Sequence, residues 1–186
     1  MSIPHEPQPG KLVLSVLAAE AWWEQHWPEF RTNLLQRLGP MDYETPALPF
    51  DHTAYYDAEL GTPLVRRIYG FERLVPLDGL VAVKLATNKE ELAQARPDGT
   101  RQVNLDPGLL TLERLVLATG KNFTHRVYLG QGIWADLTLI YNKKSGWVVL
   151  PWTFPDYATE DMRRRLTELR ALYKTTREAA APAALY

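Results

Sequence analysis

The chain of 186 residues contains no cysteine, which excludes disulfides, thiolate metal sites and cysteine nucleophiles together. It has only three serines, Ser2, Ser15 and Ser145, and none lies in a Gly-x-Ser-x-Gly sequence, so no serine triad is predicted. The longest apolar runs, such as residues 11–19, are far shorter than the roughly 20 residues that cross a bilayer. We therefore expect no membrane partner.

Charge of one sign is also scarce, because the formal net charge is −1. A nearly neutral chain has no overall attraction to nucleic acid or to anionic membranes. Residues 64–144 nevertheless hold 12 Lys and Arg against 8 Asp and Glu. This local excess is either ordinary surface variation or a central sheet that presents cations to an anionic ligand. The start, MSIPHEPQPGK, lacks the features of a signal peptide, so a cytoplasmic location is expected.

The familiar nucleotide-binding signatures are missing. The nearest match to a P-loop, residues 115–122, contains Gly120-Lys121 but lacks the first glycine and ends on Asn122 instead of a hydroxyl residue. Residues 88–91 read Asn-Lys-Glu-Glu, where a guanine-reading motif requires Asn-Lys-x-Asp. No Gly-x-Gly-x-x-Gly sequence occurs. A P-loop GTPase is therefore not predicted.

Hydrophobic periodicity predicts one α+β domain over residues 11–175, after a flexible segment at 1–10 and before a frayed tail at 176–186. Pro107-Gly108 is expected to turn the chain, and Thr159 to cap the last helix. Helices are expected at 23–38, at 78–95 (where 80–86 also fits a strand) and from 160. Strands are expected at 11–19, 42–50 (an edge strand or a strand-like loop), 53–59, 64–75, 103–106, 110–119, 125–129, 133–141 and 147–152. This order predicts a largely antiparallel or mixed sheet with the N-terminal and C-terminal helices packed on one side of it.

Polar residues interrupt the apolar central strands, where a charge must be paired or must face water. The clearest cases are Asn104, Asp106, Lys121, His125, Arg126 and Asp136. Two interpretations stay open. The residues form a salt-bridge network that fixes strand register, or they line a pocket in which Asp106 or Asp136 is a base or metal ligand and the cations hold an anion. The four histidines lack the paired spacing of a metal site, so none is predicted.

Eight sequence runs add a family resemblance. They are, in order, PFDHTAYYDAELG, FERLV, KLATN, VNLDPG, LVLAT, HRVYL, GIWADLTL and PWTFPDY. With these runs the chain resembles a prokaryotic family known as domain of unknown function 4416, over about residues 11–175. The family run L-D-P-G-Y appears here as residues 105–109 with Leu109 last, A-T-T-K as residues 118–121, and Y-A-E as residues 134–136.

The resemblance implies no established activity. Some family members carry the label GTP-binding protein, which the missing P-loop does not support in this chain. The resemblance does indicate which polar residues to follow, because they stand at motif positions: Asp51, Tyr56, Glu59, Arg66, Lys84, Asn88, Asn104, Asp106, Lys121, His125, Arg126 and Asp136.

The first hypothesis is a protein that binds or acts on an anionic small molecule, such as a nucleotide or a phosphorylated metabolite; whether it uses a cofactor stays open at this point. Its catalytic candidates are Asp106, Asp136 and His125. Its ligand-binding candidates are Tyr56, Arg66, Lys84, Asn88, Asn104, Lys121 and Arg126. It predicts that Asp106, Lys121, His125, Arg126 and Asp136 converge in one concave site.

Two alternatives belong to other functional classes. A nucleic-acid-binding module would use Tyr55, Tyr56 and Tyr128 with arginines as a stacking platform. A scaffold or homo-oligomeric domain would use the tryptophans as a contact patch. The oligomeric state stays open at this point.

Overall fold

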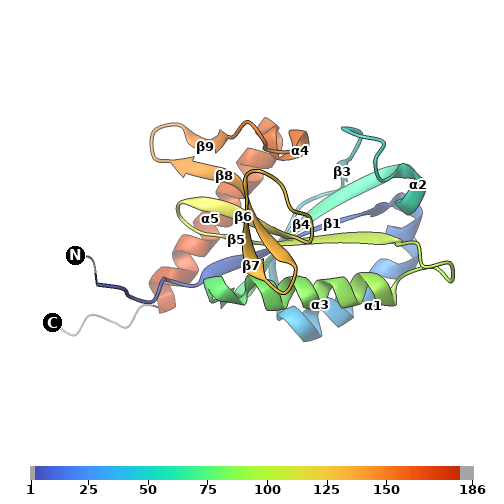
Figure 1. The fold of residues 1–186 in the computed structure, drawn as a ribbon, viewed down its shortest axis with the longest axis horizontal. Helices are drawn as coiled ribbons and strands as arrows, with labels where there is room; N and C mark the ends of the chain where they lie inside the picture. Colours follow the sequence, from blue (N-terminus) through green and yellow to red (C-terminus); the bar gives the residue numbers. More distant parts are fainter. Residues whose placement is uncertain (1–2, 181–186) are drawn as a thin grey trace.

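A computed structural model describes residues 3–180 of the chain, which form one antiparallel sheet and its covering helices (Figure 1). The strands are β1 (Gly10–Ala19), β2 (Met41–Glu44), β3 (Leu48–Pro49), β4 (Leu64–Val75), β5 (Val103–Leu110), β6 (Arg114–Thr119), β7 (Arg126–Gly130), β8 (Ile133–Asn142) and β9 (Gly146–Val149). The helices are α1 (Glu20–Leu38), α2 (Asp57–Leu60), α3 (Leu80–Ala93), α4 (Pro155–Ala158) and α5 (Glu160–Ala180), with a 3₁₀ turn at Leu77–Gly79.

The strand order is β2-β4-β1-β5-β6-β8-β7, with β3 also paired to β4 and β9 also paired to β8. Every pairing is antiparallel. The α+β fold with one antiparallel sheet is therefore confirmed. Helix α3 is confirmed as a helix, and Thr159 Oγ1 accepts a hydrogen bond from the Met162 N–H at 3.2 Å at the start of α5, as a cap should.

The helices cover both faces of the sheet, so the expectation that they pack on one side is wrong. Along β1, Leu12, Leu14 and their alternate neighbours join a cluster with Trp22 of α1, whereas Val13 joins another with Leu166 of α5. Successive residues of a strand point to opposite faces. Helices α1 and α3 therefore lie on one face and α5 on the other (Figure 1). The cause is visible in β1, where nine of ten residues are buried and both faces need a cover.

Several segments differ from the sequence prediction. The strand expected at 110–119 is divided, because β5 ends at Leu110, β6 begins at Arg114, and the Thr111 N–H donates to the Arg114 carbonyl at 2.9 Å in the turn between them. The strand expected at 42–50 is two short strands, and the one expected at 147–152 ends at Val149. Residues 53–59, expected as a strand, form a turn and α2, because the Thr53 hydroxyl accepts a hydrogen bond from the Tyr55 N–H at 3.1 Å and starts a local turn. Pro107-Gly108 does not turn the chain, and β5 continues through it. Helix α5 extends to Ala180, past the expected boundary at 175. Residues 181–186 of the expected tail, and residues 1–2 of the expected lead-in, lie outside the described residues.

Strands β5 and β6 separate part-way along their length, and this separation positions the site. They pair only where residues 108–110 face residues 115–117. Residues 103–107 of β5 pair with β1 alone, and residues 118–119 of β6 pair with β8 alone. The Thr111 N–H donates to the Arg114 carbonyl at 2.9 Å. Alternate residues of a strand direct their backbone groups to the same neighbour, so Leu109 and Pro107 also face the β6 side, where Pro107 has no N–H to donate. The proline therefore ends the β5–β6 ladder.

None of the helices within residues 3–180 has the length and apolarity needed to cross a membrane.

Candidate functional site

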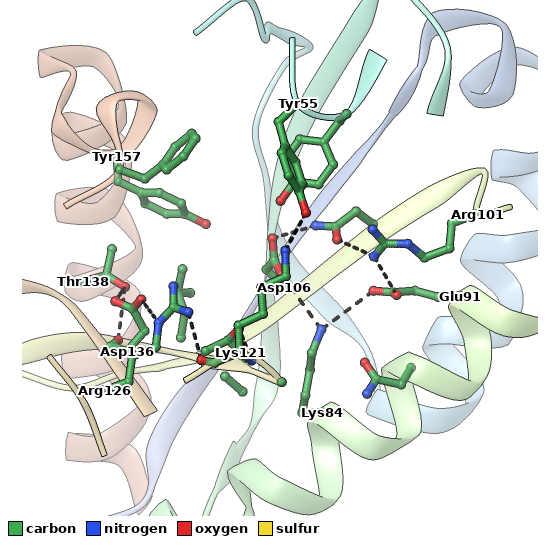
Figure 2. Close-up of a pocket in the computed structure, with 18 of the residues that line it drawn as sticks. Tyr55, Lys84, Glu91, Arg101, Asp106, Lys121, Arg126, Asp136, Thr138 and Tyr157 are labelled. Atoms are coloured by element: carbon green, nitrogen blue, oxygen red, sulfur yellow. Dashed lines mark hydrogen bonds and ion pairs between the residues drawn. The ribbon is translucent and has the colours of Figure 1, made fainter. Parts of the chain in front are cut away.

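A cavity of about 760 Å³ opens where β5 and β6 separate (Figure 2). Its walls come from β4, α3, the strands β5 to β8, and the segments around residues 53–56 and 152–157. The lining includes nine of the ten site residues predicted from the sequence, namely Tyr56, Arg66, Lys84, Asn88, Asn104, Asp106, Lys121, Arg126 and Asp136. The tenth, His125, contacts Asp136 from behind the wall.

Helix α3 closes the edge of β5 that β6 leaves unpaired. Glu91 Oε1 accepts a hydrogen bond from the Leu105 N–H at 2.6 Å, and Lys84 Nζ donates to the Leu105 carbonyl at 2.6 Å. Both side chains are about 6% exposed, and burial raises the pKa of Glu91. Lys84 and Glu91, two helical turns apart on one face of α3, thus take the place of the missing strand, because buried backbone groups need hydrogen-bond partners.

Arg101 forms the centre of an ion-pair network beside α3. Its Nε and Nη2 donate to the two carboxylate oxygens of Glu59 at 2.6 and 2.7 Å, and its Nη1 donates to Asn104 Oδ1 at 2.9 Å and to Glu91 Oε2 at 3.3 Å. These contacts lower the pKa of Glu59 and raise that of Arg101. Asn104 Nδ2 then donates to Asp106 Oδ2 at 2.7 Å, which fixes that carboxylate at the cavity wall (Figure 2).

Asp136 on β8 is held by three neighbours. Its Oδ2 accepts from Arg126 Nε at 2.9 Å and lies 3.1 Å from His125 Nε2, and its Oδ1 accepts from the Thr138 hydroxyl at 3.3 Å. The His125 ring stacks on Trp152 at 4.9 Å with an interplanar angle of 10°. Both carboxylate oxygens of Asp136 are therefore already engaged. His125 contacts this carboxylate and does not line the cavity.

Lys121 lies at the cavity mouth, in the loop after β6. Its Nζ donates to Tyr55 Oη at 2.9 Å and lies 4.7 Å from the centre of that ring, and this hydrogen bond lowers the pKa of Tyr55. Five cationic side chains line the cavity: Arg66, Lys84, Arg101, Lys121 and Arg126. Within residues 3–180, four of them lie within 4.0 Å of a carboxylate and Lys121 does not.

Arg66 of β4 lies buried in the wall that α4 covers. It forms an ion pair with Asp156, and its guanidinium carbon lies 4.7 Å from the Phe50 ring centre and 5.4 Å from that of Tyr157. Burial raises the pKa of Asp156 and of Tyr157. Burial, together with the nearby Asp106 charge, raises the pKa of Tyr56 to about 12. The phenols in this wall are therefore neutral donors at physiological pH.

No group of three His, Asp or Glu side chains suited to a metal ion gathers in the described part of the chain. The arrangement instead offers hydrogen-bond donors, one cation free of carboxylates, and aromatic rings.

Comparison with known proteins identifies the family of the chain. The sequence profile of a family described as Domain of unknown function (DUF4416) matches residues 8–173. The chain belongs to this family. No curated protein and no solved structure gives a significant match.

Sequence reasoning missed several cavity residues of this DUF4416 protein. Glu91 could have been found from a polar stripe, because Lys84, Asn88 and Glu91 follow at i, i+4 and i+7 on α3. Arg101 gave no such signal, since it lies in the loop before β5 and its partner Glu59 is 42 residues away. Tyr157 lay in a segment without a predicted element and reaches the cavity through α4.

Proposed function

We propose that the cavity binds an anionic small molecule, a nucleotide or a phosphorylated metabolite. The observation that carries this is Lys121, the cavity cation with no carboxylate within 4.0 Å among the described residues. Its charge is available to a ligand because its one protein partner is the neutral Tyr55 hydroxyl, whereas the other four cations are paired with carboxylates. The volume of about 760 Å³ also falls within the range of small-molecule sites.

The rest of the lining supports a ligand with polar and planar parts. Aromatic side chains of Tyr55, Tyr56, Trp152, Phe154 and Tyr157 surround the polar groups. Trp152 and Phe154 keep about 40% of their surface exposed although each stacks on another ring. Rings that are backed on one face and open to the cavity suit a flat or sugar-like ligand.

Among the three catalytic candidates, Asp106 is the best placed to accept a proton from a bound ligand. Its side chain is 28% exposed, and within the described residues Lys84 Nζ, 3.9 Å away, is the one cationic group within 4.0 Å of it. Asp136 is engaged by Arg126, His125 and Thr138. We therefore assign Asp106 to chemistry at this site and Asp136 to holding the wall.

The nucleic-acid alternative has less support. It needs one platform of tyrosines, but Tyr55 and Tyr56 contact each other at the cavity whereas Tyr128 packs on Trp134 across β7 and β8. A scaffold that uses tryptophans also has less support, since Trp22, Trp23 and Trp147 are buried in the core.

Lys121→Met tests the proposal against Lys144→Met, which removes an exposed lysine from the turn between β8 and β9. Thermal shifts would be recorded with inorganic phosphate, ribose 5-phosphate and nucleoside monophosphates. A ligand at 100 times its Kd stabilises by about 2.7 kcal/mol. Lys121→Met is expected to raise the Kd by roughly tenfold or more, the value of a charged hydrogen bond. The unliganded Tm should stay unchanged in both variants.

The absence of a shift with every phosphate compound would contradict the proposal. An equal Kd for the Lys121 and Lys144 variants would contradict the role of Lys121.

A further inference from the structure

Two buried hydrogen-bond donors in the cavity wall have no partner in the described part of the protein. They are the hydroxyl of Tyr157, which is 3% exposed, and Nε of Arg66, which is 4% exposed. Both residues line the cavity, and Figure 2 shows the Tyr157 hydroxyl pointing into it, towards the side on which Asp106 lies. Buried polar groups are almost always hydrogen-bonded, so each unpaired one requires an explanation.

We infer that the Tyr157 hydroxyl and Arg66 Nε bind an oxygen acceptor of the ligand, a carbonyl or hydroxyl oxygen distinct from the anionic group that Lys121 takes. This inference rests on the proposed function and narrows it. The ligand class becomes phosphorylated compounds that carry sugar hydroxyls or ring carbonyls, rather than inorganic phosphate or a simple alkyl phosphate.

The charge around the two donors favours an uncharged acceptor. Arg66 is already paired with Asp156, and both side chains are buried. A second anion on Arg66 would lie beside the Asp156 carboxylate in a poorly solvated wall, where like charges repel strongly. A carbonyl or hydroxyl oxygen satisfies both donors without adding charge.

Ser15 is the competing explanation inside the protein. Its hydroxyl, 1% exposed, lies near enough to the phenol to affect the pKa of Tyr157, yet neither oxygen forms a hydrogen bond of acceptable geometry within residues 3–180. Ser15 is not part of the cavity lining, so it offers a control at the same depth. A Ser15–Tyr157 hydrogen bond would leave the phenol with no donor for a ligand.

Tyr157→Phe separates the two explanations, because it removes the hydroxyl and keeps the ring. Without ligand, an unpaired hydroxyl contributes no hydrogen bond, so the variant should keep or slightly raise the Tm. With uridine 5′-monophosphate or ribose 5-phosphate, it should raise the Kd roughly three- to tenfold, the value of one neutral hydrogen bond. The Kd of inorganic phosphate should not change. Ser15→Ala should leave all three Kd values unchanged.

Several results would overturn the inference. One is a lower unliganded Tm for Tyr157→Phe, with non-additive effects when it is combined with Ser15→Ala. Another is an unchanged Kd for both larger compounds. A wild type that binds none of the three probes would refute the proposed function and with it the inference, whereas binding with an unchanged Kd in Tyr157→Phe would refute the inference alone.

Discussion

The closure of the β5 edge by α3 leads to a quantitative prediction for Lys84→Met. Lys84 Nζ donates to the Leu105 carbonyl at 2.6 Å and lies 3.7 Å from Glu91 Oε1. Methionine matches the length of the lysine stem but donates no hydrogen bond. The variant therefore leaves a buried carbonyl without its donor and Glu91 without its nearest lysine.

The expected magnitude follows from the burial of all three groups. Removing one partner of a buried ion pair costs about 3–5 kcal/mol, because the remaining charge stays buried. Arg101 Nη1, 3.3 Å from Glu91 Oε2, compensates part of that charge, so we expect the lower end of this range. For a chain of this length each kcal/mol lowers the Tm by about 2–4 °C, which gives a fall of roughly 10 °C.

Urea unfolding and calorimetry would measure the effect, with Lys89→Met as the control on the exposed side of the same helix. Adding Glu91→Gln to each variant completes a double-mutant cycle, and a coupling of about 1–3 kcal/mol is expected between positions 84 and 91. Equal stability of the Lys84 and Lys89 variants would refute the idea that α3 replaces the missing strand.

Two further predictions concern the network and the sheet. Arg101 lowers the pKa of Glu59, so this carboxylate stabilises the fold above its unfolded pKa near 4.5 and loses that effect as the pH falls through the folded value. Glu59→Gln should cost about 1 kcal/mol at pH 7, and urea titrations should show the difference from wild type shrinking as the pH falls below about 4.5; a constant difference would count against it. Gly108→Ala should cost about 1–3 kcal/mol, since its Cβ would lie 2.7 Å from the Val116 carbonyl oxygen, whereas Gly120→Ala has no atom within 4 Å among the described residues and should be neutral in the same assay.

The fold class was predictable because its signals are local. The buried run of β1 and the apolar stripe of α1, with Trp23, Phe30 and Leu34 on one side, are read directly from spacing. The profile match over residues 8–173 confirms the family that the sequence runs resemble. What failed was Pro107-Gly108, because the pair is typical of a turn and its real roles, ending a ladder and admitting the β6 backbone, depend on neighbours far along the chain.

The candidate site was predictable in part for a physical reason. A charged side chain within an apolar strand must meet a partner or solvent, and this rule selected Asp106 and Asp136 before any geometry was known. The rule could not decide between a network and a cavity, and the structure contains both. It also could not find Arg101, whose polar side chain in a loop needs no explanation until Glu59 and Asn104 are seen around it.

The network and the cavity have a common origin. Because Pro107 ends the β5–β6 ladder, the two strands separate and expose backbone groups of Leu105 that must then be satisfied. Lys84 and Glu91 form hydrogen bonds with these backbone groups, so both charged side chains stabilise the fold. The groups that we propose for ligand binding are ones that Leu105 does not engage: the Lys121 amine, the Asp106 carboxylate and the Tyr157 hydroxyl. Variants at position 84 should thus change stability first, and variants at positions 121 and 157 should change binding first. A chain in which all three positions affected stability equally would mean that the cavity is only a by-product of the separated strands.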